Sequence, residues 1–190
     1  MKTTIVRKPL SIDEYKKVKN SHPLVALILN TGARISEAKR LIDEYEEGML
    51  HLDIKTKKSI VTNRIYLNDM AIIALKSLSK YRNKNIKTLA RRITSVSDKI
   101  GVKFTAHNLR ATFATNLLMN GVDLVSVSTL MNHSDVSQTA MYVKFNELYL
   151  RSGLSTLDDS VETWEGMNLF QAKKEIIRLR NLLLKGGKNA

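Results

Sequence analysis

The chain contains no cysteine, and this absence removes several classes of chemistry. Without cysteine there is no disulfide bond, no thiolate nucleophile and no zinc ribbon. The four histidines are scattered along the sequence, and their spacing indicates no metal site. We therefore expect any catalysis to depend on oxygen, imidazole and cationic groups, with no cofactor and no bound metal.

Long hydrophobic runs are also missing. The longest apolar runs, such as PLVALIL at residues 23–29, are far shorter than a membrane-spanning helix of about 20 residues. The N-terminus MKTTIVRKPL lacks the apolar core of a signal peptide. The sequence therefore predicts a soluble protein of the cytoplasm that does not act at a membrane.

Acidic residues are few relative to basic ones. Lys and Arg number 31 against 18 Asp and Glu, so the 190-residue chain carries a formal net charge of +13. Such an excess favours a polyanionic partner, nucleic acid before an acidic membrane surface. A chain of this length holds one compact domain, or one domain with an appendage.

Capping signals and hydrophobic periodicity predict a mainly α-helical domain with one small antiparallel β-hairpin, an α+β fold. The hairpin is expected from the alternating stretch MLHLDI and the β-branched stretch IVTNRIYL, with KTKKS as the loop between them. Ser11 with Glu14, Pro23 and the Asn120-Gly121 pair are among the helix boundary signals. Helices are expected over residues 12–20, 23–30, 35–42, 70–81, 88–100, 107–119, 123–131 and 137–143.

The stretch AHNLRATFAT opens one of these helices. Because residues three apart share a helix face, His107 and Arg110 should point the same way, beside the unpaired N–H groups of the helix N-terminus. That arrangement can bind a phosphate group. The pattern is short, and by itself it better fits a histidine near a helix start with a solvated Arg110.

Two further stretches give this pattern a context. TGARISEAKRL places Arg34 after a glycine turn at a helix start, and LMNHSDVSQTAMY contains His133 and, nine residues later, Tyr142. In order and spacing the three stretches closely resemble the tyrosine recombinase family, which includes phage-type integrases and chromosome-dimer resolvases. The resemblance covers about residues 10–150.

The resemblance implies a tyrosine recombinase catalytic-domain fold over residues 1–160. The helical apolar stripe of NLFQAKKEIIRLRNLLLKGG predicts a C-terminal helical tail over residues 161–190. The resemblance also implies a set of catalytic residues, namely Arg34, Lys55, His107, Arg110, His133 and Tyr142. The sequence departs from the family pattern at one place, and the change is small. The family's second histidine normally follows Leu-Gly, where this chain has Met131-Asn132, and Asn tolerates a positive φ better than other non-glycine residues.

The activity implied is that of a site-specific recombinase that cleaves and rejoins double-stranded DNA through a 3′-phosphotyrosine. Without a metal, the negative charge of the phosphorane must be neutralised by fixed cations, which Arg34 and Arg110 can supply. Tyr142 attacks as a phenolate and, with an ordinary pKa near 10, needs a cationic site or a nearby base. His107 could accept that proton or bind the phosphate, and His133 could hydrogen-bond the phosphate.

The remaining role, the general acid, falls to a lysine of the hairpin loop in this family. KTKKS resembles that loop, whose first lysine is the acid, and this selects Lys55. Counting back nine residues from Leu67 selects Lys58 instead. We prefer Lys55 and expect the other lysine to contact the DNA backbone.

Several alternatives stay open at this point. A type IB topoisomerase-like enzyme shares the active site, and a basic DNA-binding module would have no catalysis.

The resemblance further implies a homo-oligomer, a tetramer on DNA, and composition suits an archaeal viral or plasmid integrase in the host cytoplasm. The apolar face of the predicted tail helix packs either on its own domain or on a neighbouring protomer. We adopt the second hypothesis, packing on a neighbouring protomer. The family's N-terminal DNA-binding domain is either removed here or encoded separately.

Overall fold

The computed structural model describes residues 8–55 and 62–143 of the chain. Two of the sequence predictions lie outside these residues. They are the loop that follows Lys55, which includes Lys58, and the C-terminal tail at residues 161–190, together with the domain boundary before it.

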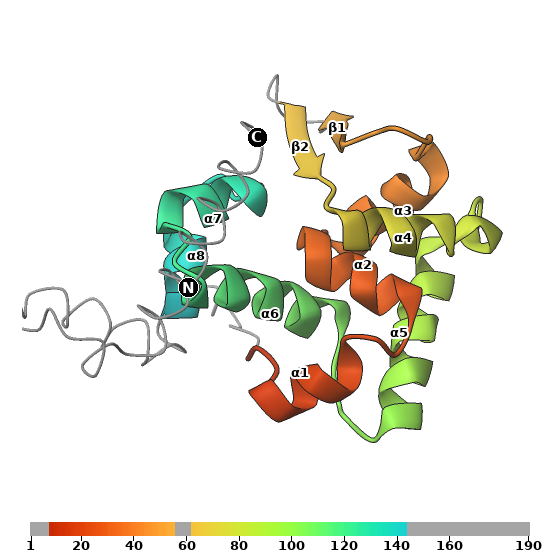
Figure 1. Cartoon of the computed structure of the whole chain (residues 1–190), viewed down its shortest axis with the longest axis horizontal. Helices are drawn as coiled ribbons and strands as arrows, with labels where there is room; N and C mark the ends of the chain where they lie inside the picture. The colour runs from red at the N-terminus through yellow and green to blue at the C-terminus, as the bar shows by residue number, and fades with distance from the viewer. Residues whose placement is uncertain (1–7, 56–61, 144–190) are drawn as a thin grey trace, which may run out of the picture.

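The described residues form eight α-helices, one short 3₁₀ helix and one two-stranded antiparallel sheet (Figure 1). The predicted α+β fold class is therefore confirmed. In chain order the elements are α1 (Ile12–Val18), α2 (Pro23–Thr31), α3 (Ile35–Glu44), β1 (His51–Lys55), β2 (Thr62–Tyr66), α4 (Asp69–Lys76), η1 (Ser79–Tyr81), α5 (Ile86–Ile100), α6 (Ala106–Met119), α7 (Leu124–Leu130) and α8 (Ser137–Val143). Among the described residues no helix is long and apolar enough to cross a membrane.

Capping explains where most helices begin. Ser11 and Glu14 form the predicted capping box of α1, and Asp123 caps α7 by accepting a hydrogen bond from the backbone N–H of Ser126 at 2.9 Å. Helix α5 begins two residues earlier than predicted because Asn85 caps it, accepting from the backbone N–H of Thr88 at 2.8 Å.

The prediction of one helix over residues 70–81 is wrong. Helix α4 ends at Lys76, and a 3₁₀ turn follows. Leu75, Leu78 and Tyr81 are three residues apart and are all at least 91% buried, with exposures of 4%, 0% and 7%. Because a 3₁₀ helix has three residues per turn, tightening the chain here keeps all three side chains on the core side.

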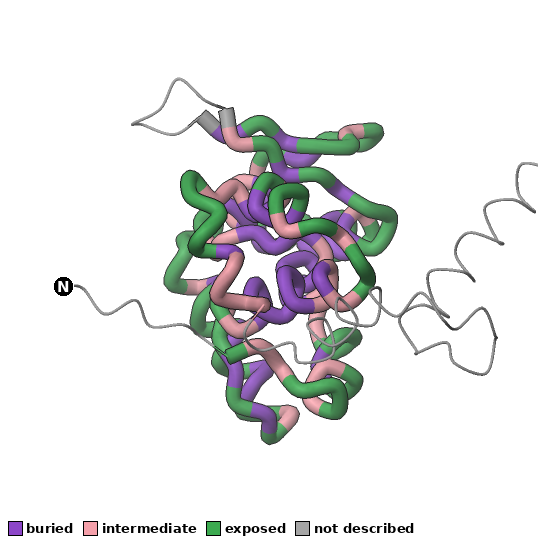
Figure 2. Tube along the Cα trace, turned by 90° about the vertical axis from the view of Figure 1, so that its left-hand side faces the viewer, coloured by how far each residue is buried: buried purple, intermediate pink, exposed green. Residues whose placement is uncertain are grey.

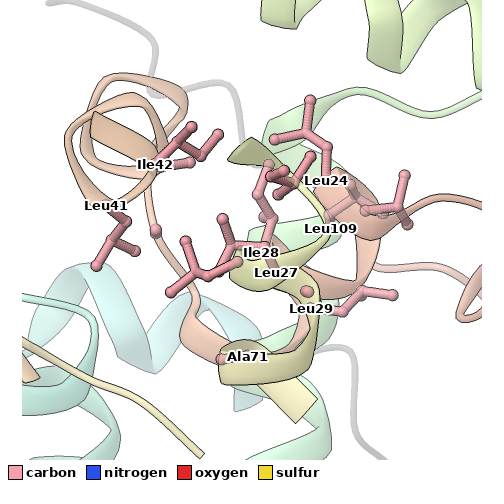
Figure 3. Packing of buried hydrophobic residues seen from close by; sticks show 14 of the residues in the cluster. Leu24, Leu27, Ile28, Leu29, Leu41, Ile42, Ala71 and Leu109 are labelled. Carbon is pink, nitrogen blue, oxygen red and sulfur yellow. The ribbon is translucent and has the colours of Figure 1, made fainter. Parts of the chain in front are cut away.

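Helix α2 is the centre of the main core. Its Leu24, Leu27 and Ile28 are fully buried, and they lie among side chains of α3, α4 and α6, such as Leu41, Ala71 and Leu109 (Figure 3). An apolar run bounded by a proline and a glycine turn is well suited to such a position, since every face of the helix is covered. Figure 2 shows the buried residues gathered along the inside of the molecule.

A second, smaller cluster packs α7 and α8 onto the C-terminal half of α6. It consists of Phe113, Ala114, Leu118, Val127 and Met131, and Tyr142 packs against it. Because Leu109 belongs to the main core, α6 joins the two clusters, and Arg110 lies at the junction between them.

The sheet is a hairpin in which His51 pairs with Tyr66 and Lys55 with Thr62. Leu52, Ile54 and Ile65 are buried. On the other face, Arg64 donates to its cross-strand partner Asp53, with 2.7 Å between Nε and Oδ1. Both strands end within two residues of their predicted limits, and the alternation of buried and exposed residues is as predicted.

Candidate active site

The turn between α2 and α3 sets the position of Arg34. Gly32 has a φ of 64°, which is the left-handed conformation that favours glycine. A Cβ at this position would lie 2.4 Å from Cδ1 of Phe113. Both the positive φ and the contact with Phe113 therefore require glycine at this position. The turn places Arg34 at the N-cap of α3, with a side chain that is 41% exposed.

Glu37 joins the two arginines of the site. Its carboxylate accepts from the backbone N–H and from Nη1 of Arg34, each at 2.7 Å, and its Oε2 lies 3.5 Å from Nη1 of Arg110. The residue is only 8% exposed. The sequence identified Glu37 only as part of the TGARISE motif and assigned it no role. The signal available was the capping-box spacing from Arg34.

Arg110 is buried, with 5% exposure, so the alternative of a solvated arginine is wrong. Its guanidinium donates to the carbonyl of Gly32 at 2.5 Å and to the carbonyl of Met131. These bonds link the end of α2 to the end of α7. Burial, reinforced by repulsion from Arg34, lowers the pKa of Arg110 to about 10, while Glu37 and Tyr142 act in the opposite direction. The group is still protonated at neutral pH.

His107 lies in the first turn of α6, whose N-cap is Thr105. It is exposed, whereas Arg110 three residues later is buried. Of Arg34, His107, Arg110, His133 and Tyr142, His107 is the one that is exposed. Its joint role with Arg110 in binding phosphate stays a prediction.

The turn after α7 carries His133. Asn132 before it has a φ of 50°, as expected for the residue that replaces glycine here. The Asn132 side chain donates to the carbonyl of Arg64 at 3.2 Å, a contact that glycine could not make. His133 in turn approaches Thr139, with 2.7 Å between Nδ1 and Oγ1. The turn is therefore tied both to the hairpin and to α8.

His133 is a neutral imidazole at pH 7. Burial, with the positive charges of Arg110 and then Arg34, lowers its pKa to about 4. Both guanidinium groups are thus within electrostatic range of the ring. His133 can therefore act as a hydrogen-bond donor toward an anion through one nitrogen only.

Tyr142 is half-buried on α8 and stacks on His133, with ring centroids 6.5 Å apart and an angle of 19° between the rings. Burial raises the pKa of its hydroxyl, and Arg110 and Arg34 lower it by less. The two arginines thus act in the expected direction, but burial outweighs them. A cationic site alone does not make Tyr142 a phenolate, so its proton must pass to a base during attack.

Lys55 is the last residue of β1, opposite Thr62. The structure therefore brings together Arg34, Arg110, His133 and Tyr142, and it places His107 and Lys55 at the ends of α6 and β1. Two guanidinium groups, a neutral imidazole and a phenol suit attack on a phosphodiester, where negative charge develops around phosphorus.

The other tyrosines in the described residues do not join this cluster. Tyr45 and Tyr81 are buried, and the hydroxyl of Tyr81 accepts from Nε of Arg92 at 2.8 Å. Tyr15 packs against the main core, and Tyr66 is 51% exposed on the hairpin. Packing or surface positions account for all four.

Comparisons with known proteins identify relatives of the chain. Residues 6–148 match the phage integrase family. The chain is 30% identical to tyrosine recombinase XerC of Caldanaerobacter subterraneus over 184 residues, covering 79% of this chain and 51% of that protein. It is 28% identical to tyrosine recombinase XerA of Pyrococcus furiosus, covering 77% of this chain and 60% of that protein. The chain thus spans about half to three-fifths of the length of these relatives.

Solved structures show the same fold. The crystal structure of XerA recombinase superimposes with a TM-score of 0.63 at 21% identity, covering 83% of this chain and 68% of that one. The post-cleavage complex of the XerH site-specific recombinase bound to palindromic difH substrate gives a TM-score of 0.62 at 20% identity, covering 81% and 54%. The described residues therefore have the tyrosine recombinase catalytic-domain fold.

Proposed function

Because the chain belongs to the phage integrase family, we propose that it is a site-specific DNA recombinase, a metal-independent strand transferase acting through a 3′-phosphotyrosine. One observation carries the proposal. Tyr142 lies against His133 at the place where Arg34 and Arg110 converge on Glu37. A nucleophile, a neutral donor and two fixed cations are what phosphodiester cleavage without a metal requires.

The two arginines neutralise the charge that develops on the phosphate oxygens. The contacts of Arg110 with described residues use three of its five N–H donors. The other two suit a phosphate oxygen. Arg34, 41% exposed at the rim, can supply a second planar fork of donors.

In the proposed reaction, the Tyr142 oxygen attacks phosphorus while its proton passes to His107. The bond to the 5′ oxygen breaks, and that oxygen takes a proton from Lys55. The product is a 3′-phosphotyrosine and a free 5′ hydroxyl. Attack by the 5′ hydroxyl of a second strand reverses these steps and joins the strands in a new combination, with no external energy source.

The wider role follows from the activity. The substrate is double-stranded DNA, consistent with the net charge of +13. Exchange of strands between two duplexes needs four active sites, and so a tetramer, with the tail at residues 161–190 packing on a neighbouring protomer. Such a protein works in the cytoplasm, that of the host cell if the integrase is viral. The catalytic domain ends near residue 160 in this account.

The experiment is recovery of covalent adducts from a library of nicked suicide DNA duplexes, with and without excess EDTA at fixed ionic strength. We expect protein–DNA adducts that are enriched in one sequence and insensitive to the chelator. Relaxation of any supercoiled plasmid without a preferred site would instead indicate a topoisomerase. Loss of adducts in EDTA would indicate metal catalysis, and no adduct at all would indicate a DNA-binding module.

A further inference from the structure

Thr139 is an unusual buried residue of α8. It is fully buried, and Oγ1 lies 2.7 Å from Nδ1 of His133. It precedes Tyr142 by three residues, so the two side chains lie on one face of the helix. Its position places it behind the histidine on which the nucleophile stacks.

The hydroxyl of Thr139 differs from those of other helical threonines in the protein. Four of them, namely Thr31, Thr94, Thr112 and Thr129, donate to the carbonyl four residues earlier, at 2.7 to 3.3 Å. For Thr139 that residue is Asp135, which precedes the first residue of α8, Ser137. Within the described part of the chain, the Thr139 hydroxyl is hydrogen-bonded to the imidazole of His133.

The surroundings of Thr139 favour one direction for this hydrogen bond. Most buried hydroxyls in folded proteins have a hydrogen-bond partner, although among the described residues that of Thr115 has none, and the bare Nδ1 of a neutral imidazole can accept from the Thr139 hydroxyl. If Nδ1 carried the proton instead, the Thr139 hydroxyl proton would be left without that acceptor. A bond from Oγ1 to Nδ1 satisfies both groups, and it leaves the single ring proton on Nε2.

We propose that Thr139 is a positioning residue that holds His133 as the Nε2–H tautomer, so that the imidazole presents an N–H donor to the scissile phosphate. The role in cleavage rests on the proposed function. Nδ1 faces α8 through Thr139, and the backbone N–H of His133 donates to the Ser128 carbonyl at 3.0 Å. The backbone of His133 is thus fixed, its Nδ1 contacts Thr139 and its ring stacks with Tyr142, so that Nε2 lies at the edge turned away from Thr139.

The charge state makes the tautomer matter. With a pKa of about 4, His133 has one ring proton at pH 7. The other tautomer would present a lone pair at Nε2 to a phosphate oxygen and repel it. Arg110 and Arg34 cannot correct this, because their effect is to keep the ring neutral.

The test compares Thr139→Val, which replaces the hydroxyl with a methyl group of similar size, with Thr139→Ser, which keeps the hydroxyl. Long-range ¹H–¹⁵N spectra of the full chain labelled at histidine report the state of each ring nitrogen, and His133→Gln identifies the His133 signals. We expect Nδ1 to be unprotonated and hydrogen-bonded in the unmodified protein and in Thr139→Ser. In Thr139→Val its resonance should move to that of a nitrogen without a hydrogen bond.

Single-turnover cleavage of a suicide duplex gives the second readout. Thr139→Val should cleave about tenfold more slowly, with DNA affinity unchanged, and Thr139→Ser should restore the rate. A protonated Nδ1 in the unmodified protein overturns the proposal, even if Thr139→Val fails to fold. Unchanged Nδ1 shift and unchanged cleavage in a folded Thr139→Val also overturn it. Absence of cleavage in the unmodified protein would instead overturn the proposed function, while the spectra still decide the tautomer.

Discussion

One carboxylate, that of Glu37, contacts both arginines of the active site. Arg110 is buried, and a buried guanidinium without a nearby anion is costly. The shared carboxylate therefore stabilises the fold and at the same time sets the distance between the two cations that we propose to bind the phosphate.

Replacing Glu37 with Gln should lower the free energy of unfolding by about 2–4 kcal/mol, because it leaves Arg110 without its buried counter-ion. The matched control is Glu44→Gln in the same helix, whose carboxylate pairs with Arg40 in a bridge in which both side chains are about two-fifths exposed. That change should cost less than about 1 kcal/mol. Urea unfolding of both variants measures the difference, and equal costs would contradict the shared role of Glu37.

Stability should depend on pH through His133. Its pKa is about 4 in the folded protein, against about 6.5 when unfolded. Its contribution is present above pH 6.5. As the pH falls toward 4, the unfolded chain takes up a proton that the folded chain does not, so stability is lost. Denaturant unfolding at pH 7.5 and pH 5 should show a larger loss for the unmodified protein than for His133→Gln. Equal losses in the two proteins would count against a neutral, buried His133.

For individual residues, the sequence predicted which side chains form the site better than it predicted their burial and pKa. The motifs selected Arg34, Arg110, His133 and Tyr142, which the structure brings together. They could not show that burial raises the pKa of Tyr142, because burial depends on how α8 packs against α6. The same holds for the contact between Arg110 and Glu37.

At the level of secondary-structure elements, Phe113 of α6 packs against Gly32 in the turn before α3. Gly32→Ala should be destabilising for two reasons, the positive φ and the contact of the new Cβ with the Phe113 ring. Gly48→Ala is the control, since Gly48 also has a positive φ, 90°, and no atom within 4 Å of an added Cβ. We expect Gly32→Ala to cost about 1–3 kcal/mol more than Gly48→Ala in thermal or urea unfolding. If the two cost the same, Phe113 does not pack as described.

The hairpin is joined to the His133 turn by the bond from Asn132 to the Arg64 carbonyl. This bond suits a hairpin that delivers a general acid to the site, and Lys55 ends its first strand. A duplex with a 5′-bridging sulfur has a leaving group that needs no proton. Such a duplex should therefore restore cleavage by Lys55→Ala and not raise cleavage by Lys58→Ala relative to the unmodified protein. Rescue of Lys58→Ala alone would assign the acid to Lys58.

Element boundaries were predictable where a local signal sets them. Ser11 and Asp123 are caps that act within three residues, and the two helices begin at the predicted residue and one residue after it, respectively. The break between α4 and η1 was not predictable, because it follows from burying Leu78 and Tyr81 against the rest of the core. Periodicity alone is compatible with one continuous helix there.

For the molecule as a whole, the site lies where the two hydrophobic clusters meet. Arg110, between Leu109 of the main core and Phe113 of the smaller cluster, binds carbonyls at the ends of α2 and α7. The catalytic groups are thus contributed by both parts of the fold, and Tyr142 comes from the smaller one. Order and spacing of the motifs predicted this constellation, while the junction itself is a property of the packed chain.

The central claim is that Tyr142 is the nucleophile, and the direct measurement is peptide mapping of the covalent adduct formed on a suicide duplex. Tyr142→Phe removes one hydroxyl, so it should fold and bind DNA nearly as the unmodified protein does and form no adduct. Mass spectrometry of the digested adduct should place the nucleotide on the peptide that contains Tyr142. An adduct that persists in Tyr142→Phe, or one that maps to another tyrosine, would contradict the account.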